Sequence, residues 1–228
     1  MTYCGGSCYY LFIDNLIVLT LLNSLLASAT IAGTLTLQGT APTPPPTIAA
    51  VPSEPVVEEV KPEVTVKFWT LPNASSVEAK LLTALQTRGI EDRNAIATVM
   101  GNVKQESRFT PNICEGGARV SYWGCHRGGY GLIQWTTADR YRGLGSHAYS
   151  LGLDPSSAEA QISFIFTERQ WKSIEPSLKR NGHSINYYMN KAYYWLGWGV
   201  HGNRTTYAYN YASNLVSIEV PVTAKNDV

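Results

Sequence analysis

The sequence predicts a mainly α-helical domain with a small hairpin or loop region, preceded by a single hydrophobic helix and a Pro-rich stalk. An uncharged 22-residue stretch, residues 16–37, comes first. Residues 41–64 then contain seven of the chain's 12 prolines. From about residue 73, apolar residues recur at helical spacing. The expected organisation is 1–40 as anchor or signal, 41–72 as linker, 73–216 as globular domain and 217–228 as tail.

Residues 16–37 are long enough to cross a bilayer as one helix, which takes about 20 residues. No Lys or Arg precedes Lys61, so loop charge gives no orientation and the basic start of a secretory signal is missing. Residues 27–29 (ASA) nevertheless resemble a cleavage site. We therefore rank an uncleaved membrane anchor first, a cleaved signal second and a buried core helix third. A helix that disrupts membranes by itself is the least favoured role.

The composition of residues 41–64 favours an extended polyproline-like spacer, which spans about 3 Å per residue. The net charge of the chain is +1, but residues 73–228 carry 16 basic and 12 acidic side chains. This mild excess suits an anionic polymer. There is no dense Lys/Arg run, so nucleic acid is not an expected partner.

The domain begins with a predicted helix that Ser75 or Ser76 caps and that ends near Gly89. A second helix is predicted from about Asp92 to Glu106. Residues 114–131 contain six glycines and should form a loop or hairpin. The later helices are expected at residues 158–171, 185–196 and 205–215, with a strand as the alternative for the last.

The four cysteines form two close pairs, Cys4 with Cys8 and Cys114 with Cys125. Neither pair has a second pair or histidines at zinc-ligand spacing, so no metal site and no cofactor are expected. In an oxidising compartment Cys114 and Cys125 would form a disulfide across the glycine-containing loop, and two free thiols are the alternative.

Glu106 lies at the edge of the apolar face of its predicted helix, at the C-terminal end. Partial burial and the negative end of the helix dipole both raise the pKa of a carboxyl group. A carboxyl with a raised pKa can stay protonated and serve as a general acid. The alternative is an exposed, inert glutamate, and helical geometry does not decide between the two.

Two motifs follow one another around Glu106. Residues 101–112 read GNVKQESRFTPN, and residues 129–136 read GYGLIQWT. In this order, with a short loop between them, they resemble the phage tail lysozyme family of the lysozyme-like superfamily, which includes goose-type lysozymes and lytic transglycosylases. The resemblance covers about residues 73–215.

The resemblance implies a lysozyme-like α+β fold with Glu106 as the general acid. It also implies that Ser107 supports the turn beneath Glu106 and that Gln134 lines a glycan cleft. Tyr130 and Trp135 would flank the cleft, and a plain core position is the alternative for Trp135.

A second carboxylate is not assigned by the resemblance. Inverting hydrolysis needs a base across the sugar, about 6.5–9.5 Å away, and Glu115 and Asp139 are the candidates. Asp139 also fits the cap of a short helix. Many superfamily members use one glutamate and the substrate's N-acetyl group, which gives either hydrolysis or an anhydro-sugar product.

The expected function is therefore a muramidase that cleaves the β-1,4 bond between N-acetylmuramic acid and N-acetylglucosamine in bacterial peptidoglycan. It would be phage-encoded, for wall penetration or lysis. The expected location is the virion, with other virion proteins as partners, or an exported or membrane-anchored form acting in the host periplasm. The alternative is a non-catalytic wall-binding or structural virion module.

Overall fold

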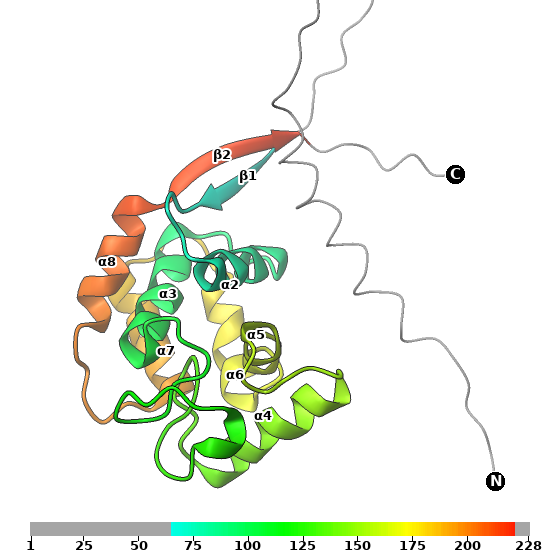
Figure 1. The fold of residues 1–228 in the computed structure, drawn as a ribbon. Helices are drawn as coiled ribbons and strands as arrows, with labels where there is room; N and C mark the ends of the chain where they lie inside the picture. Colours follow the sequence, from blue (N-terminus) through cyan, green and yellow to red (C-terminus); the bar gives the residue numbers. More distant parts are fainter. Residues whose placement is uncertain (1–64, 222–228) are drawn as a thin grey trace, which may run out of the picture. The chain divides into compact units, whose positions relative to one another are not determined.

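The computed structural model describes residues 65–221, which belong to one compact unit. The expected membrane segment at 16–37, most of the linker at 41–72 and residues 222–228 lie outside the described residues. Within residues 65–221, no helix is both long and apolar enough to cross a membrane. The elements in chain order (Figure 1) are β1 Thr65–Thr70, α2 Ser76–Thr87, α3 Arg93–Ser107, the 3-10 helix η2 Tyr122–Gly124, α4 Ala138–Ser150, α5 Ala158–Ile165, α6 Arg169–Leu178, α7 Ile185–Leu196, α8 Arg204–Asn214 and β2 Val216–Pro221.

The predicted mainly helical fold with a small β component is confirmed. Strands β1 and β2 pair antiparallel, from Thr65 opposite Pro221 to Thr70 opposite Val216, so the two ends of the described chain meet (Figure 1). This sheet was not predicted, because residues 65–70 fell in the expected linker and 217–221 in the expected tail. Gln86 of α2 fixes β1 by accepting a hydrogen bond from Trp69 N at 2.6 Å and donating one to Trp69 O at 2.9 Å.

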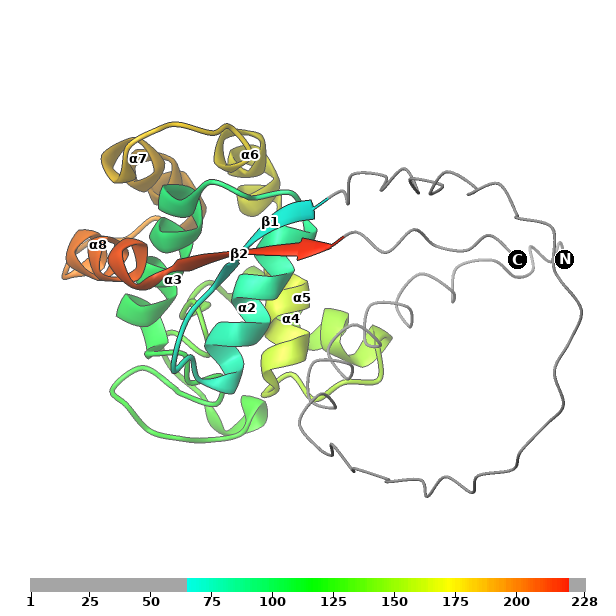
Figure 2. The same ribbon diagram turned by 90° about the horizontal axis from the view of Figure 1, so that it is seen from above.

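Helix α3 is the central element and packs against α2, α7 and α8. It begins because the Asp92 carboxylate accepts hydrogen bonds from the backbone N–H groups of Asn94 and Ala95, as an N-cap residue does. Its middle needs Gly101, since a Cβ there would lie 2.6 Å from the backbone N of Ala208 in α8. The two helix backbones are therefore in direct contact. Figure 2 shows α6 and α7 together on one side of the domain and α4 and α5 together on another.

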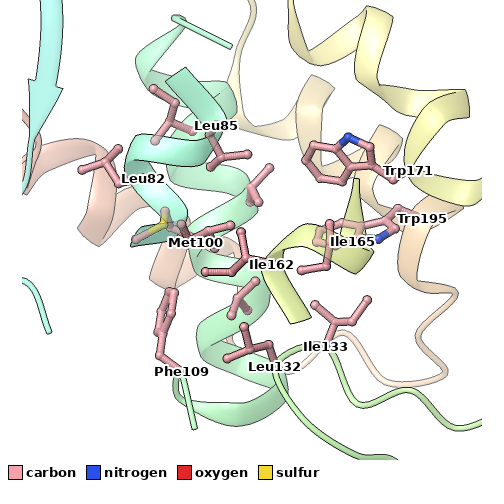
Figure 3. Packing of buried hydrophobic residues seen from close by; sticks show 14 of the residues in the cluster. Leu82, Leu85, Met100, Phe109, Leu132, Ile133, Ile162, Ile165, Trp171 and Trp195 are labelled. Carbon is pink, nitrogen blue, oxygen red and sulfur yellow. The ribbon is translucent and has the colours of Figure 1, made fainter. Parts of the chain in front are cut away.

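The hydrophobic core fills the space between α3 and the surrounding helices (Figure 3). Met100 of α3 lies in this cluster together with side chains from α2, α5 and the turn before α4. Trp171 of α6 and Trp195 of α7 close its far side, with their rings edge to face at 4.9 Å. Burying large apolar and aromatic side chains is the main stabilising term of such a domain.

The helix predicted over residues 158–171 is wrong, because the chain forms two helices there, α5 and α6. Residues 166–168 break it, and the turn sends the Glu168 side chain inward, where it is 6% exposed. The short helix expected at Asp139 is instead the 13-residue helix α4, which Thr137 precedes as N-cap residue. The helices predicted at the start of the domain and at 185–196 are confirmed, and residues 204–214 are helical rather than a strand.

Candidate active site

Glu106 lies in the last turn of α3, where the chain turns sharply out of the helix. Arg108 and Phe109 both adopt left-handed backbone conformations, with φ of 51° and 59°. The Phe109 ring is buried against Tyr211 of α8 at 6.1 Å, which holds the turn in place. The Glu106 side chain keeps 16% of its surface exposed.

The partner of Glu106 is Arg204, the first residue of α8. Arg204 Nη2 donates a hydrogen bond of 2.7 Å to Glu106 Oε1, and the arginine side chain is 5% exposed. Its guanidinium lies over the ring of Trp198, 4.7 Å from the centroid. Arg204 had no assigned role in the sequence, since it is far from Glu106 along the chain and carries no motif. From the sequence, Trp198 is expected in an aromatic cluster of the core, with a sugar-stacking platform as the alternative.

The surroundings of Glu106 act on its pKa in two directions. Burial raises the pKa of Glu106 above its ordinary value, and the nearby cations Arg204 and Arg140 oppose part of that rise. The helical-wheel expectation of partial burial is met. Glu106 can thus take up a proton at a higher pH than an exposed glutamate, which is the property that a general acid requires.

Glu106 opens onto a cleft of about 480 Å³. Three of its lining residues are largely buried: Glu106, Arg204 and Ile133. The walls come from three segments that are far apart in the sequence: the loop 113–117, the turn containing Gln134 and Thr136, and residues 196–200 between α7 and α8. The cleft is thus lined by Glu106 of the first motif and by residues of the second motif. In the described part of the chain, no group of three or more His, Cys, Asp or Glu side chains could hold a metal ion.

A disulfide between Cys114 and Cys125 closes the glycine-containing loop. The loop is pinned further by an isolated antiparallel bridge between Cys114 and Tyr130 and by a hydrogen bond of 3.0 Å from Gly129 N to Glu115 Oε2. Residues 114–117 form one wall of the cleft. The disulfide therefore ties that wall to the rest of the loop.

Removing this disulfide with the double substitution Cys114→Ser and Cys125→Ser should lower the free energy of unfolding by about 3 kcal/mol, since an 11-residue loop is no longer closed in the unfolded chain. Urea unfolding of the oxidised wild type and of the variant measures the difference. Adding a reductant to wild type should reproduce it, and a variant as stable as the oxidised wild type would show that the crosslink constrains neither state.

The second motif is held against the end of α3 by two buried polar side chains. Ser107 Oγ donates to Leu132 O at 2.9 Å. Gln161 of α5 is fully buried, and its Oε1 accepts from Leu132 N at 2.8 Å while its Nε2 donates to Pro111 O at 2.7 Å. Ser107 thus supports the turn beneath Glu106 and does not line the cleft. Gln161 joins both motifs, and sequence analysis gave it no role of its own.

Gln134 lines the cleft, as expected, from a left-handed backbone position with φ of 53°. Such a conformation is unfavourable for a residue with a side chain and persists where surrounding bonds hold it. Gln134 Nε2 donates to Gly131 O at 2.9 Å, which bends the side chain back over its own turn. Within residues 65–221 no hydrogen bond reaches the side-chain oxygen, which can therefore accept one from a ligand.

Tyr130 and Trp135 do not flank the cleft, because both side chains are fully buried. Trp135 Nε1 donates to Glu168 Oε1 at 3.0 Å, and the same carboxylate receives two hydrogen bonds from Arg140. Trp135 therefore takes the alternative core position, and its polar edge is satisfied inside the protein. Both aromatic residues shape the turn that carries Gln134.

The two candidate second carboxylates differ in position. Glu115 lines the same cleft as Glu106 and is exposed to solvent. Asp139 lies in the first turn of α4, does not line the cleft, has a 93% exposed side chain and pairs with Arg142. The fold therefore brings Glu115, and not Asp139, into one cavity with Glu106.

Comparison with known proteins adds the family. The sequence profile of the family described as phage tail lysozyme matches residues 76–215, from the first residue of α2 to the residue after α8. The match includes Glu106, Gln134, Glu115 and Arg204, and leaves strands β1 and β2 outside. Searches of curated proteins and of solved structures find no match. Because the matched region covers more than half of the sequence, this chain belongs to the phage tail lysozyme family, a family of peptidoglycan-degrading enzymes.

Proposed function

We propose that the chain is a muramidase that cleaves the β-1,4 bond between N-acetylmuramic acid and N-acetylglucosamine, with Glu106 as the general acid. The observation that carries the proposal is the place of Glu106: it is largely buried and lines a cleft to which the second motif also contributes. Protonated Glu106 would give its proton to the glycosidic oxygen as the bond to the leaving sugar breaks. The family supports this reaction class.

Gln134 and the backbone of the cleft walls would bind the sugars. The free oxygen of the Gln134 amide can accept from a hydroxyl or from the N–H of an acetamido group. Glu115 is the group that we propose as second carboxylate, because it shares the cleft with Glu106. The competing route uses the substrate's own acetamido oxygen in place of a base.

The two routes make different predictions for Glu115→Gln. If Glu115 activates water, the variant should lose about 100-fold or more in the rate of cell-wall clearing and should still fold. If the substrate's acetamido oxygen takes the place of the base, the clearing rate of Glu115→Gln should change less than tenfold. Asp139→Asn is the matched control, since this carboxylate lies outside the cleft.

The experiment that tests the function is the clearing of a cell-wall suspension by the full-length chain, followed by mass spectrometry of the released fragments. Fragments with a reducing end indicate hydrolysis, and anhydro-muramic acid ends indicate transglycosylation. Binding without clearing would overturn the muramidase proposal in favour of a wall-binding or structural virion module. We propose, from the family, that the enzyme is phage-encoded and acts on the wall from the virion during penetration or lysis.

A further inference from the structure

The contact between Glu106 and Arg204 follows from the closest helix packing in the domain. Gly101 allows the backbone of α3 to touch that of α8 at Ala208. This contact fixes the register of the two helices, so the last turn of α3 meets the first residue of α8. Glu106 and Arg204 are both largely buried at that point, and their separation of 2.7 Å is set by the fold rather than by two free surface chains.

The pair conflicts with the task of a general acid. A cation in hydrogen-bond contact favours the ionised form of a carboxyl group. A proton donor must carry its proton when the substrate reacts. Arg204 therefore opposes the rise in the pKa of Glu106 that burial causes, so withdrawing its hydrogen bond would make Glu106 a better proton donor.

Arg204 has unused capacity to bind an incoming oxygen. Among residues 65–221, its Nε and Nη1 are buried and have no hydrogen-bond partner. Buried N–H groups without an acceptor are unfavourable, so the guanidinium gains when an acceptor arrives. The carbonyl oxygen of an acetamido group and the hydroxyl oxygens of a sugar are such acceptors.

Trp198 covers Arg204 and lines the cleft. It lies between Gly197, which has a positive φ of 65°, and Gly199, in the link from α7 to α8. Val200 in the same link is 80% exposed. A glycan that fills the cleft contacts this wall, and moving the indole uncovers the donors of Arg204.

The other titratable groups on the elements around Glu106 form no hydrogen bond or ion pair with it in the described structure. These groups are Lys104 on α3, Glu115 on the loop wall, Arg140 on α4, Glu168 before α6 and His201 on the link to α8. In the described structure Arg204 is the group hydrogen-bonded to Glu106, and Arg140 directs its bonds to Glu168. The control over Glu106 therefore lies with Arg204.

We propose that Arg204 is the positioning residue of this cleft: its hydrogen bond favours the carboxylate form of Glu106 before a glycan binds, and a bound N-acetylated glycan draws the guanidinium away so that Glu106 becomes the better proton donor. This inference rests on the proposed role of Glu106. In this proposal, binding of the substrate itself favours the protonated form of Glu106.

The test compares pH–rate profiles of the full-length chain on soluble, uncrosslinked glycan strands of alternating N-acetylglucosamine and N-acetylmuramic acid. The kcat/KM profile reports the free protein and the kcat profile reports the complex. In wild type, the alkaline limb of the kcat profile should lie about one pH unit above the alkaline limb of the kcat/KM profile. In Arg204→Met the kcat/KM limb should rise to meet it, and Arg204→Lys should restore part of the separation.

A second measurement does not need turnover. Carbon-13 NMR titration of the Glu106 carboxyl in the full-length chain should give a midpoint about one unit higher in Arg204→Met than in wild type. Arg108→Met is the matched control, because this exposed arginine lies two residues from Glu106 and, in the described structure, forms no hydrogen bond or ion pair with it. The proposal would be overturned if wild type and Arg204→Met had equal titration midpoints. It would also be overturned if the alkaline limbs of the kcat and kcat/KM profiles of wild type coincided. A shifted midpoint without any wall cleavage would instead contradict the muramidase function and leave the pairing in place.

Discussion

Replacing Glu106 with glutamine is expected to slow the clearing of cell walls by about 100- to 10,000-fold. Glutamine has the same shape and can still accept the hydrogen bond from Arg204 Nη2, but it has no proton to give to a leaving sugar. The measurement is the initial rate of turbidity loss with the full-length chain at equal protein concentration.

The matched control for this variant is Glu91→Gln. Glu91 is exposed and precedes the other end of α3, so the same charge is removed far from the cleft. Thermal unfolding of both variants shows whether they fold, because the glutamine leaves the buried Arg204 without a counter-ion. A folded Glu106→Gln variant that clears walls within tenfold of wild type would remove Glu106 from the role of acid.

The largest effect on stability is expected for Gln161→Leu. The leucine would leave Leu132 N, Pro111 O and Pro155 O without their side-chain partner. A buried polar group that loses its partner costs about 1–3 kcal/mol, so the free energy of unfolding should fall by about 3 kcal/mol or more. The midpoint of urea denaturation measures the change.

Gln170→Leu provides the comparison for Gln161→Leu. Gln170 lies in α6, is half-buried, and forms no side-chain hydrogen bond within residues 65–221. Its replacement should leave the midpoint nearly unchanged. Because Gln161 joins the two motifs, wall clearing by its variant should fall even at temperatures where the protein stays folded. If the two variants have equal midpoints, water has replaced the hydrogen bonds that the Gln161 side chain makes to the loop backbone.

The helices could be predicted from the sequence because their signals are local. Ser75 and Asp92 cap the helices that follow them, and apolar residues repeat at the spacing that the core requires. Glu106 was found by the same means, but its significance came from the order of the two motifs. Helical geometry placed it at the edge of the core, and the cleft around it depends on loops that geometry does not predict.

The features that were missed depend on contacts between distant residues. Strand β1 carries no strong signal by itself, and its partner lies about 150 residues away. The break between α5 and α6 exists because Glu168 turns inward to bind Trp135 and Arg140. Trp135 could not be assigned to core or cleft until that acceptor was known. Arg204 is one arginine among many until α8 is laid against α3.

The pairing of β1 with β2 has a mechanical consequence. Thr65 and Pro221, the two ends of the described chain, lie opposite each other at one end of the sheet. A force that pulls these two residues apart acts on that pair first and separates the strands one residue pair at a time, towards Thr70 and Val216. The two strands lie outside the region that matches the family. Under such a force the sheet would therefore separate before the helices that form the cleft are disturbed.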